Sequence, residues 1–349
     1  MERPKVFNMK ETKEILENII NRFPGISCAY RDAEGKVTTK CFGFADKEEN
    51  VPVDENTAFP ACSISKFITA ICVMKECEQG RIEIDNPVNL YLRRWKFLTS
   101  SGKESNASIR SLLSHTSGII DGEDGFYGLR RSDPPVSLMD VLDGKTSYNN
   151  RPAREDNPQG TEFEYSDAGF CVLQMLLEDL EQKPYEVIAK EYVFEPLNLN
   201  NTFSASPANL SDYERRIVMA TGYDENGLAI PGKFPQMPDL AASGLWSTPK
   251  ELLEIAKEFT NACKDESSLL SADSALKMAT PSERFPWVGL GIFMDGENTL
   301  SISGWGENGQ SRLRFNYRTG EAAVVMVNQN PGVDQSESGV ERLIKNGAE

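Results

Sequence analysis

The pattern of apolar and polar positions first predicts a helix and then a pair of strands. Between residues 13 and 23 apolar side chains recur at the spacing of one helical face, and Pro24 ends the run. These apolar positions are Ile15, Leu16, Ile19, Ile20 and Phe23. Between residues 26 and 44 two strand-like runs flank Asp32-Ala33-Glu34-Gly35, a sequence typical of a hairpin turn. The chain is therefore expected to begin with an amphipathic helix and the first hairpin of an antiparallel sheet.

The middle of the chain predicts helices and long loops, and the end predicts strands again. Helical patterns occupy most of residues 61–285. Glycine and proline interrupt them around residues 118–135, 144–160 and 222–238. Four short apolar or alternating runs then predict a β-meander, at residues 287–294, 299–303, 311–317 and 322–328. Residues 337–345 predict a closing helix.

Strands at both ends with helices between them favour one α/β (α+β) unit over a string of modules. A chain of 349 residues can bury a large core. We expect an antiparallel sheet flanked by helices, built from about residues 1–60 and 285–349. Residues 61–284 are expected to form a mainly helical second lobe, so that residues 1–349 make a single unit. The active site is expected in the cleft between the lobes.

The charge of the chain excludes two classes of partner. The sequence holds 53 acidic and 37 basic side chains, which gives a formal net charge of −16. Such an excess of carboxylates repels phosphate backbones and anionic lipid surfaces. Nucleic acids and membrane surfaces are therefore not expected partners.

No segment of the sequence indicates export or insertion into a membrane. The first twenty residues hold no apolar stretch of secretory length, and no later window has the roughly 18 apolar residues that span a bilayer. The seven cysteines form an odd set without a CxxC pair or the spacing of a zinc site. We therefore expect a cytoplasmic protein whose cysteines are mostly reduced and buried.

A serine and a lysine at helical spacing are the first candidates for chemistry. Ser63-Ile64-Ser65-Lys66 opens an apolar stretch that predicts a helix ending near Gly80. Ser63 and Lys66 then lie on one helical face, where a neutral lysine can take the hydroxyl proton. The N–H of Ser63 can also stabilise an oxyanion at the start of the helix. Alternatively, Ser63 only caps the helix and Lys66 is solvated, because S-x-x-K alone is a short motif.

A tyrosine and an aspartate precede a second apolar helix. Tyr165-Ser166-Asp167 stands directly before the helix predicted at residues 168–180. A nearby lysine lowers the pKa of a phenol, so Tyr165 can relay a proton to a leaving group. Asp167 has an alternative structural role, because an aspartate at this position is also a suitable N-cap for the helix.

A glycine-rich loop follows the strand predicted near residue 301. Gly304, Gly306 and Gly309 satisfy G-x-G-x-x-G, the pattern of dinucleotide-binding loops. A strand at residues 312–317 follows where such a fold requires a helix, so the pattern does not predict a dinucleotide site. Glycines beside an edge strand instead allow a substrate to approach the backbone closely.

His115 is the only histidine of the chain. A single histidine excludes multi-histidine zinc sites and leaves one candidate for a Ser-His-Asp triad. Its segment, residues 112–118, predicts a helix end with a glycine cap. We therefore assign His115 a structural role and assign the role of the base to Lys66.

Together these motifs resemble the serine β-lactamase-related family. This family contains class C β-lactamases, D-alanyl-D-alanine carboxypeptidases, D-aminopeptidases and lactamase-like esterases. Residues 63–66 look like its S-x-x-K motif, and residues 165–167 look like its Y-x-N motif. LLSHTSGI at residues 112–119, the glycine turn at 241–249 and VGLGI at 288–292 are also similar to family segments. The resemblance spans nearly the whole chain, in the same order and spacing.

The resemblance implies a fold and a set of roles. The fold is β-lactamase/transpeptidase-like, an antiparallel sheet flanked by helices with a helical second lobe. Ser63 is implied as the nucleophile and Lys66 as the proton acceptor. Tyr165 is implied as the group that exchanges protons with the leaving group or with the deacylating water. The strand near residues 303–306 is implied to supply the second oxyanion N–H.

Two departures from the family pattern bear on the substrate. Asp167 replaces the usual asparagine, and an ionised carboxylate cannot donate a hydrogen bond to an amide carbonyl. The same carboxylate favours the charged form of Lys66 unless burial opposes it. The third motif is Ser303-Gly304-Trp305 or Trp305-Gly306-Glu307, depending on register, and neither offers the lysine or histidine that opens it in the family. Asp167 and residues 303–306 are therefore expected to bind a substrate without a carboxylate.

The favoured function is that of a serine hydrolase that forms an acyl-enzyme on an ester or amide. The implied partner is a small-molecule ester, amide or peptide, and neither a metal nor an organic cofactor is implied. A D-amino-acid amidase or peptidase, or a weak β-lactamase, is the nearest alternative. A penicillin-binding-like sensing module that has lost turnover is an alternative from another class, because the second and third motifs are both altered.

Overall fold

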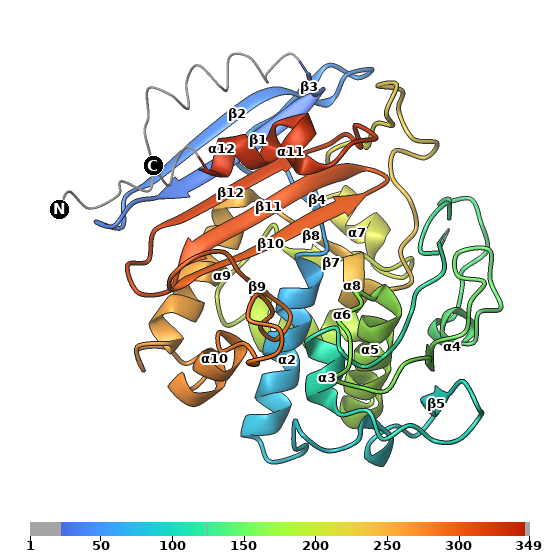
Figure 1. Cartoon of the computed structure of the whole chain (residues 1–349). Coiled ribbons are helices and arrows are strands. Elements are labelled where there is room, and N and C mark those ends of the chain that lie inside the picture. The colour runs from blue at the N-terminus through green and yellow to red at the C-terminus, as the bar shows by residue number, and fades with distance from the viewer. Residues whose placement is uncertain (1–21, 124, 346–349) are drawn as a thin grey trace.

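A seven-stranded antiparallel sheet joins the two ends of the chain. The computed structural model describes residues 22–123 and 125–345. The strand order is β3-β2-β1-β12-β11-β10-β9 (Figure 1). The strands are β1 (Gly25–Arg31), β2 (Val37–Asp46), β3 (Val51–Pro52), β9 (Phe293–Met294), β10 (Thr299–Gly306), β11 (Gly309–Asn316) and β12 (Ala322–Val327). β1 pairs with both β2 and β12, so the first hairpin lies directly beside the last strand. The strands from both ends of the chain thus form one sheet, as the sequence predicted.

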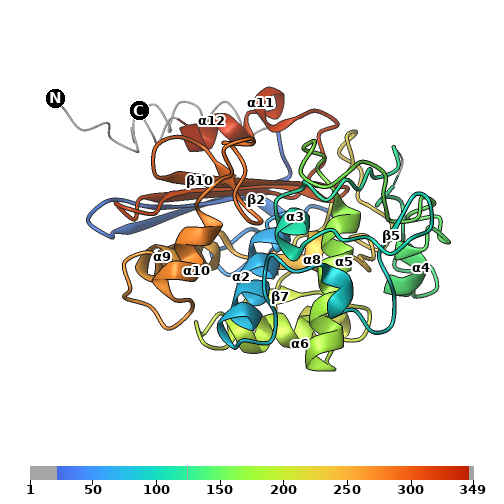
Figure 2. The same ribbon diagram turned by 60° about the horizontal axis from the view of Figure 1, so that its bottom comes forward.

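The central strands β1 and β12 are almost entirely buried, because helices cover both faces of the sheet. α2 (Ser65–Glu78) and α9 (Pro249–Ala262) lie on one face, and α11 (Gln335–Ser338) and α12 (Val340–Lys345) lie on the other (Figure 2). Alternate side chains of β12 enter different cores. Val325 packs in the core with Leu343 of α12, whereas Val324 belongs to the larger core with Phe67 of α2. This double burial explains the uninterrupted apolar sequence of β12.

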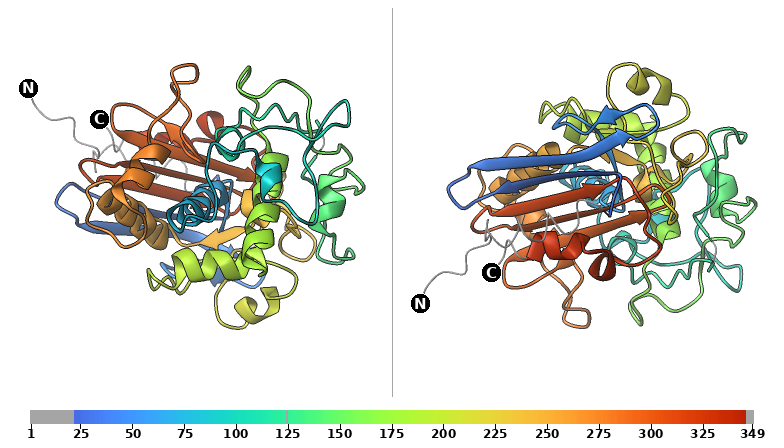
Figure 3. Two further views of the ribbon diagram at one scale, coloured as in Figure 1. Left: turned by 90° about the horizontal axis from the view of Figure 1, so that it is seen from below. Right: turned by 90° about the horizontal axis from the view of Figure 1, so that it is seen from above.

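Several of the remaining helices pack against α2, whose residues are buried at eleven of fourteen positions. The helices are α3 (Ile109–Leu113), α4 (Leu138–Leu142), α5 (Asp167–Glu181), α6 (Tyr185–Ala189), α7 (Leu210–Glu214), α8 (Leu240–Ser243) and α10 (Ala272–Met278). The short strands are β4 (Phe59–Cys62), β7 (Phe203–Ser204) and β8 (Leu245–Ser247), in the order β4-β8-β7, and the pair β5 (Leu98–Thr99) and β6 (Arg154–Glu155). Figure 3 shows this helical layer from below and the sheet from above.

Three sequence predictions differ from the structure or fall outside it. Residues 13–21 of the predicted first helix lie outside the described residues, and residues 22–24 form a turn. The predicted strand 287–294 is reduced to β9, because the chain turns at Gly291 (φ +69°) where its backbone packs on α2. The closing helix is divided into α11 and α12 at Gly339, which has φ +94°. A Cβ at either glycine conflicts with such a backbone.

The division into two lobes at residues 60 and 285 stays a proposal. α9 belongs by sequence to the stretch 61–284, yet it packs beneath the sheet with Phe259 against Phe315 of β11. Among the residues that the structure describes, no helix combines the length and the apolar character needed to cross a membrane. The seven cysteines are all free thiols, in agreement with the expectation from their spacing.

Candidate active site

Ser63 and Lys66 are in direct contact at the start of α2. β4 ends at Cys62, whose left-handed backbone (φ +47°) turns the chain toward α2. The Nζ atom of Lys66 donates hydrogen bonds to Ser63 Oγ (3.0 Å) and to the carbonyl of Ala242 (3.0 Å). Ile64 occupies the cap position of α2, which has no side-chain cap. The alternative of Ser63 as a cap with a solvated Lys66 is therefore wrong.

Tyr165 completes a group of three polar side chains. Its hydroxyl lies close enough to Lys66 and Ser63 to interact with both, and Lys66 Nζ lies 4.9 Å from the centre of its ring. The side chain as a whole is 40% exposed, so one part of the ring faces solvent while the hydroxyl end points inward. The structure thus brings together the serine, lysine and tyrosine from two separate motifs.

Asp167 binds Lys66 and does not cap α5. One carboxylate oxygen of Asp167 lies 2.5 Å from Lys66 Nζ. The cap of α5 is Ser166, whose hydroxyl accepts a hydrogen bond from the N–H of Gly169 (2.9 Å). The prediction that Asp167 caps the helix is therefore wrong, because the residue before it is the cap. Its carboxylate is free to act as the counter-ion of the lysine.

The environment keeps both Lys66 and Tyr165 protonated. Burial lowers the pKa of the fully buried Lys66, but the charge of Asp167 and the contact with Tyr165 raise it, and the net pKa lies above the usual value. Burial raises the pKa of the Tyr165 phenol more than the neighbouring Lys66 lowers it. The predicted fall in the tyrosine pKa is therefore wrong, because burial outweighs the nearby positive charge.

Two more carboxyl groups lie behind this site, and the sequence analysis did not find them. Asp121 accepts hydrogen bonds from Ser166 Oγ (2.7 Å) and from the N–H of Asp167 (2.6 Å). Asp239 accepts one from the hydroxyl of Tyr148 (2.6 Å). Burial and the charge of Asp167 raise the pKa of Asp121 to about 6 and that of Asp239 to about 7. A lone aspartate in the apolar run before α8 is the only sequence signal for Asp239.

We expect Asp239→Asn to flatten the pH dependence of stability. Because the pKa of Asp239 rises from 3.8 to about 7, the folded chain keeps a proton that the unfolded chain loses. Stability of the wild type should therefore fall as the pH rises from about 4 to about 7. An asparagine cannot ionise and can still accept the bond from Tyr148. Thermal unfolding of both proteins across this range measures the effect, and parallel curves for the two proteins would contradict it.

His115 has a structural role, as the sequence indicated. It is buried, its Nδ1 accepts a hydrogen bond from the N–H of Ser166 (3.1 Å), and its ring stacks on Tyr165 at 4.4 Å. Burial and the nearby charge of Lys66 hold its pKa well below the usual range, so the ring is neutral. The helix end differs from the prediction, because His115 itself adopts the left-handed backbone (φ +55°) after α3. The imidazole positions Tyr165.

The glycine-rich strand β10 runs beside the serine. A Cβ on Gly304 would lie 2.4 Å from the carbonyl oxygen of Ala61 and 3.0 Å from Cys62 Cβ, so only glycine allows this approach. β9 pairs with β10 only at Leu300 and Ser301, and no described strand covers the same edge at residues 303–306. β10 and β11 form a hairpin, as expected, and no helix follows the glycines.

The side chains of this open edge carry no positive charge. Ser303 and Trp305 are exposed, whereas Gly304 is buried. The indole N–H of Trp305 donates to the side chain of Asn330 (2.7 Å). Glu307, in the turn after β10, accepts hydrogen bonds from Arg130 and from the N–H of Gly128. The third motif therefore lies beside Ser63 without a lysine or histidine.

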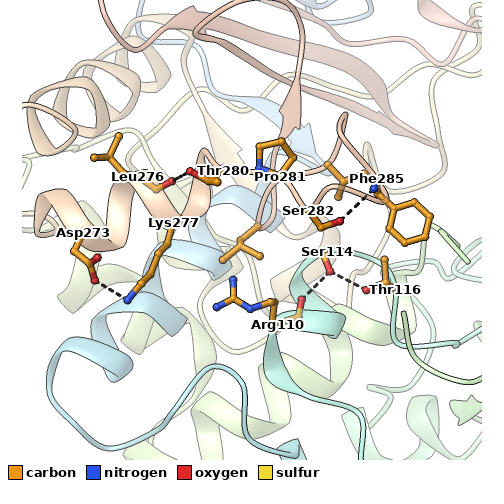
Figure 4. A pocket seen from close by; sticks show the side chains of 12 residues that line it. Arg110, Ser114, Thr116, Asp273, Leu276, Lys277, Thr280, Pro281, Ser282 and Phe285 are labelled. Carbon is orange, nitrogen blue, oxygen red and sulfur yellow. Dashed lines mark hydrogen bonds and ion pairs between the residues drawn. The ribbon is translucent and has the colours of Figure 1, made fainter. Parts of the chain in front are cut away.

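A separate cavity of about 420 Å³ lies between α3, α10 and residues 280–290 (Figure 4). Its two cations are already paired. Arg110 binds Asp85 (2.6 Å) and Lys277 binds Asp273 (2.6 Å). Ser63, Lys66, Tyr165 and Asp167 are not among the residues that line it. The reactive groups therefore lie elsewhere, at the open edge of β10.

The fold and the arrangement of these motifs define a class of protein. The chain belongs to the beta-lactamase family, whose model matches residues 12–345. Its fold is accordingly the β-lactamase/transpeptidase-like one that the motifs implied. This agreement covers the sheet, the helices and the order of the motifs along the chain.

Individual relatives are distant. The chain is 25% identical over 273 residues to the putative penicillin-binding protein PbpX of Bacillus subtilis, covering 78% of this chain but only 62% of PbpX. An octameric penicillin-binding protein homologue from Pyrococcus abyssi is 22% identical, with a TM-score of 0.79 over 97% of this chain and 77% of that one. A D-amino acid amidase from Ochrobactrum anthropi is 18% identical, with a TM-score of 0.78 over 97% of both chains. Such likeness shows the fold.

Proposed function

We propose that this protein is a serine hydrolase that forms an acyl-enzyme on an ester or amide, with Ser63 as the nucleophile. One observation carries the proposal. Lys66 Nζ contacts both Ser63 Oγ and the carboxylate of Asp167, and the hydroxyl of Tyr165 lies beside Lys66 and Ser63. A hydroxyl linked to a carboxylate through a single amine has a path by which it can lose its proton.

The proton path differs from the one that the sequence analysis assigned to a neutral lysine. Because Lys66 is already an ammonium, it cannot simply accept a proton. Ser63 Oγ forms a bond to the substrate carbonyl carbon and passes its proton to Lys66, while Lys66 passes one of its own to Asp167. The negative charge then lies on the carbonyl oxygen, which the N–H of Ser63 and the edge of β10 at residues 303–306 stabilise.

Tyr165 serves the second half of acylation. When the bond to the leaving group breaks, the phenol gives its proton to the leaving oxygen or nitrogen. Tyr165 recovers a proton from Lys66, and Lys66 recovers one from Asp167, so the site returns to its starting charge. A water molecule then attacks the acyl-enzyme, its proton follows the same path, and Ser63 leaves as the hydroxyl.

The same arrangement favours an ester or another uncharged substrate over a carboxylate-bearing one. Ser303 and Trp305 offer no cation at the third motif, and Lys66 is already paired with Asp167. A D-amino-acid amidase is the second candidate within this fold, because an amidase has the same overall structure. A sensing module that has lost turnover is the candidate from another class, because the third motif lacks a cation and Asp167 holds Lys66 in its charged form.

The proposal is tested by turnover of p-nitrophenyl acetate, with D-phenylalanine amide and a chromogenic cephalosporin assayed in parallel as alternative substrates. We expect steady ester hydrolysis that a fluorophosphonate probe abolishes at one equivalent per chain. Labelling by the cephalosporin without release of product supports the sensing module. A lack of both turnover and labelling with all of these compounds removes the proposal.

A further inference from the structure

Exposed aromatic side chains gather at one place on this protein. Among the described residues, five aromatic side chains are between 40% and 52% exposed. They are Phe44, Tyr127, Tyr165, Trp287 and Trp305. Phe44 lies on β2, near the far edge of the sheet. Of the other four, Trp287 is linked to Tyr165 through two further rings, and Tyr127 and Trp305 both interact with the side chain that follows β12 at residue 330. Exposed rings concentrated at one site indicate a surface that binds an apolar group.

One side of the site is a continuous row of rings, which we call the aromatic wall: Tyr165, Phe293, Phe163 and Trp287. The ring of Tyr165 stacks with Phe293 at 6.4 Å, Phe293 meets Phe163 at 6.2 Å, and Phe163 meets Trp287 at 6.3 Å. The wall is held against α2, because Gly291, two residues before Phe293, packs its backbone on the backbone of Lys66. Its free surface is therefore fixed before any ligand binds.

The inner part of the wall is supported from behind. His115 stacks on Tyr165 at 4.4 Å and meets Phe163 edge-on at 5.9 Å. Phe285 supports Trp287 edge-on at 5.8 Å. Buried or half-buried rings thus fill the back of the wall, while Tyr165 and Trp287 keep nearly half of their surfaces in solvent. Rings that are packed on one side and exposed on the other are suited to binding an apolar group.

The opposite side of the site presents rings whose polar atoms are already occupied. Asn330 accepts the indole N–H of Trp305 (2.7 Å), and its side chain also lies close enough to the hydroxyl of Tyr127 to interact with it. The nearby cation Arg130 is paired with Glu307. These rings offer a ligand apolar faces, and no charge in this group is left without a partner.

The charges behind the reactive groups work against an anionic ligand. Asp121 and Asp239 each lie within hydrogen-bonding or electrostatic reach of Asp167, and Lys66 is the cation that Asp167 binds. A carboxylate on the substrate would lose its hydration without gaining a free cation. The site therefore suits an uncharged molecule with a large apolar group.

We propose that the aromatic wall binds an aromatic or bulky apolar leaving group of an uncharged ester or amide, an inference that rests on the proposed function. The wall is assigned to the leaving group because Tyr165, which gives the leaving group its proton, is one of its members. Trp287 is the specificity-determining residue, since it is the most exposed ring of the wall and takes no part in the proton path.

The test compares two acetate esters whose alcohols have similar acidity, benzyl acetate and methyl acetate. We expect the wild type to have a higher kcat/KM for the benzyl ester. Trp287→Ala should lower the benzyl value of kcat/KM by about tenfold, the effect of losing one aromatic contact with the ligand, and leave the methyl value nearly unchanged. The benzyl ester with a carboxylate on its ring, 4-(acetoxymethyl)benzoate, should be a poorer wild-type substrate than benzyl acetate.

Phe44→Ala is the matched control, because it removes a similarly exposed ring on β2, near the far edge of the sheet, and should leave kcat/KM unchanged for both esters. Equal losses for both esters in Trp287→Ala, or a preference for the carboxylated ester, overturn the inference. Labelling of Ser63 by a fluorophosphonate in the same samples separates the two proposals. If Ser63 is labelled but Trp287→Ala does not lower kcat/KM for benzyl acetate, the aromatic wall is not a leaving-group site. If neither turnover nor labelling occurs, the proposal of a serine hydrolase is itself rejected.

Discussion

Replacing Ser63 with alanine is expected to lower ester turnover by about 10⁴-fold or more, because removal of a serine nucleophile leaves only binding and oxyanion stabilisation. The substitution removes one atom that accepts a hydrogen bond from Lys66. Lys66 keeps its contacts with Asp167 and with the carbonyl of Ala242, so the fold should be little affected. Initial rates with p-nitrophenyl acetate and the unfolding temperature of both proteins measure the two expectations.

Ser114→Ala is a suitable control for that variant. Ser114 is a partly buried serine on the neighbouring α3 segment, and it lines the separate cavity of Figure 4. Within the part of the chain that the structure describes, its hydroxyl bonds only to the carbonyl of Arg110 and to Thr116. We expect nearly wild-type turnover from this variant. Full activity in Ser63→Ala, or loss of activity in Ser114→Ala alone, would place the reaction in a different part of the molecule from the one proposed.

Lys66→Met is expected to slow acylation by about 10³-fold, within the range that general acid–base groups contribute. Methionine has a similar length but carries no proton, so Ser63 loses its link to Asp167. The variant should also be less stable. A buried ion pair that loses one partner costs about 3–5 kcal/mol, and the cost here is reduced because the Asp167 side chain is 23% exposed.

The double variant Lys66→Met/Asp167→Asn separates the two effects. It removes the unpaired carboxylate, so we expect stability to return toward that of the wild type while acylation stays slow. The rate of fluorophosphonate labelling and the free energy of unfolding are the two measurements. Labelling of Lys66→Met at the wild-type rate would show that the lysine is outside the proton path, and recovery of labelling in the double variant would show that only stability had been lost.

The parts of the site that depend on short motifs were predictable from the sequence. Ser63 and Lys66 are three residues apart, so the local helical geometry at the start of α2 is sufficient to place them in contact. Tyr165 required the family resemblance, because nothing in its own segment says that it faces another helix. The sheet was predictable for a similar reason, since alternating and apolar runs occur at both ends of the chain.

The parts that depend on tertiary burial were not predictable. Asp121 and Asp239 look like ordinary polar residues in the sequence, and their raised pKa values arise only because the fold buries them beside Asp167. The sign of the Tyr165 pKa shift depends in the same way on how deeply its hydroxyl is buried. The strand predicted at residues 287–294 failed because packing of Gly291 on α2 determines the local backbone.

The central claim, that Ser63 is acylated, is tested most directly by locating the acyl group on the protein. The wild type and Ser63→Ala are mixed with p-nitrophenyl acetate, quenched with acid within the first turnover, digested and analysed by mass spectrometry. We expect one acetyl group on Ser63 of the wild type and none on the same peptide of the variant. An acetyl group on another residue of the wild type, or hydrolysis with no covalent adduct at any quench time, would contradict the claim.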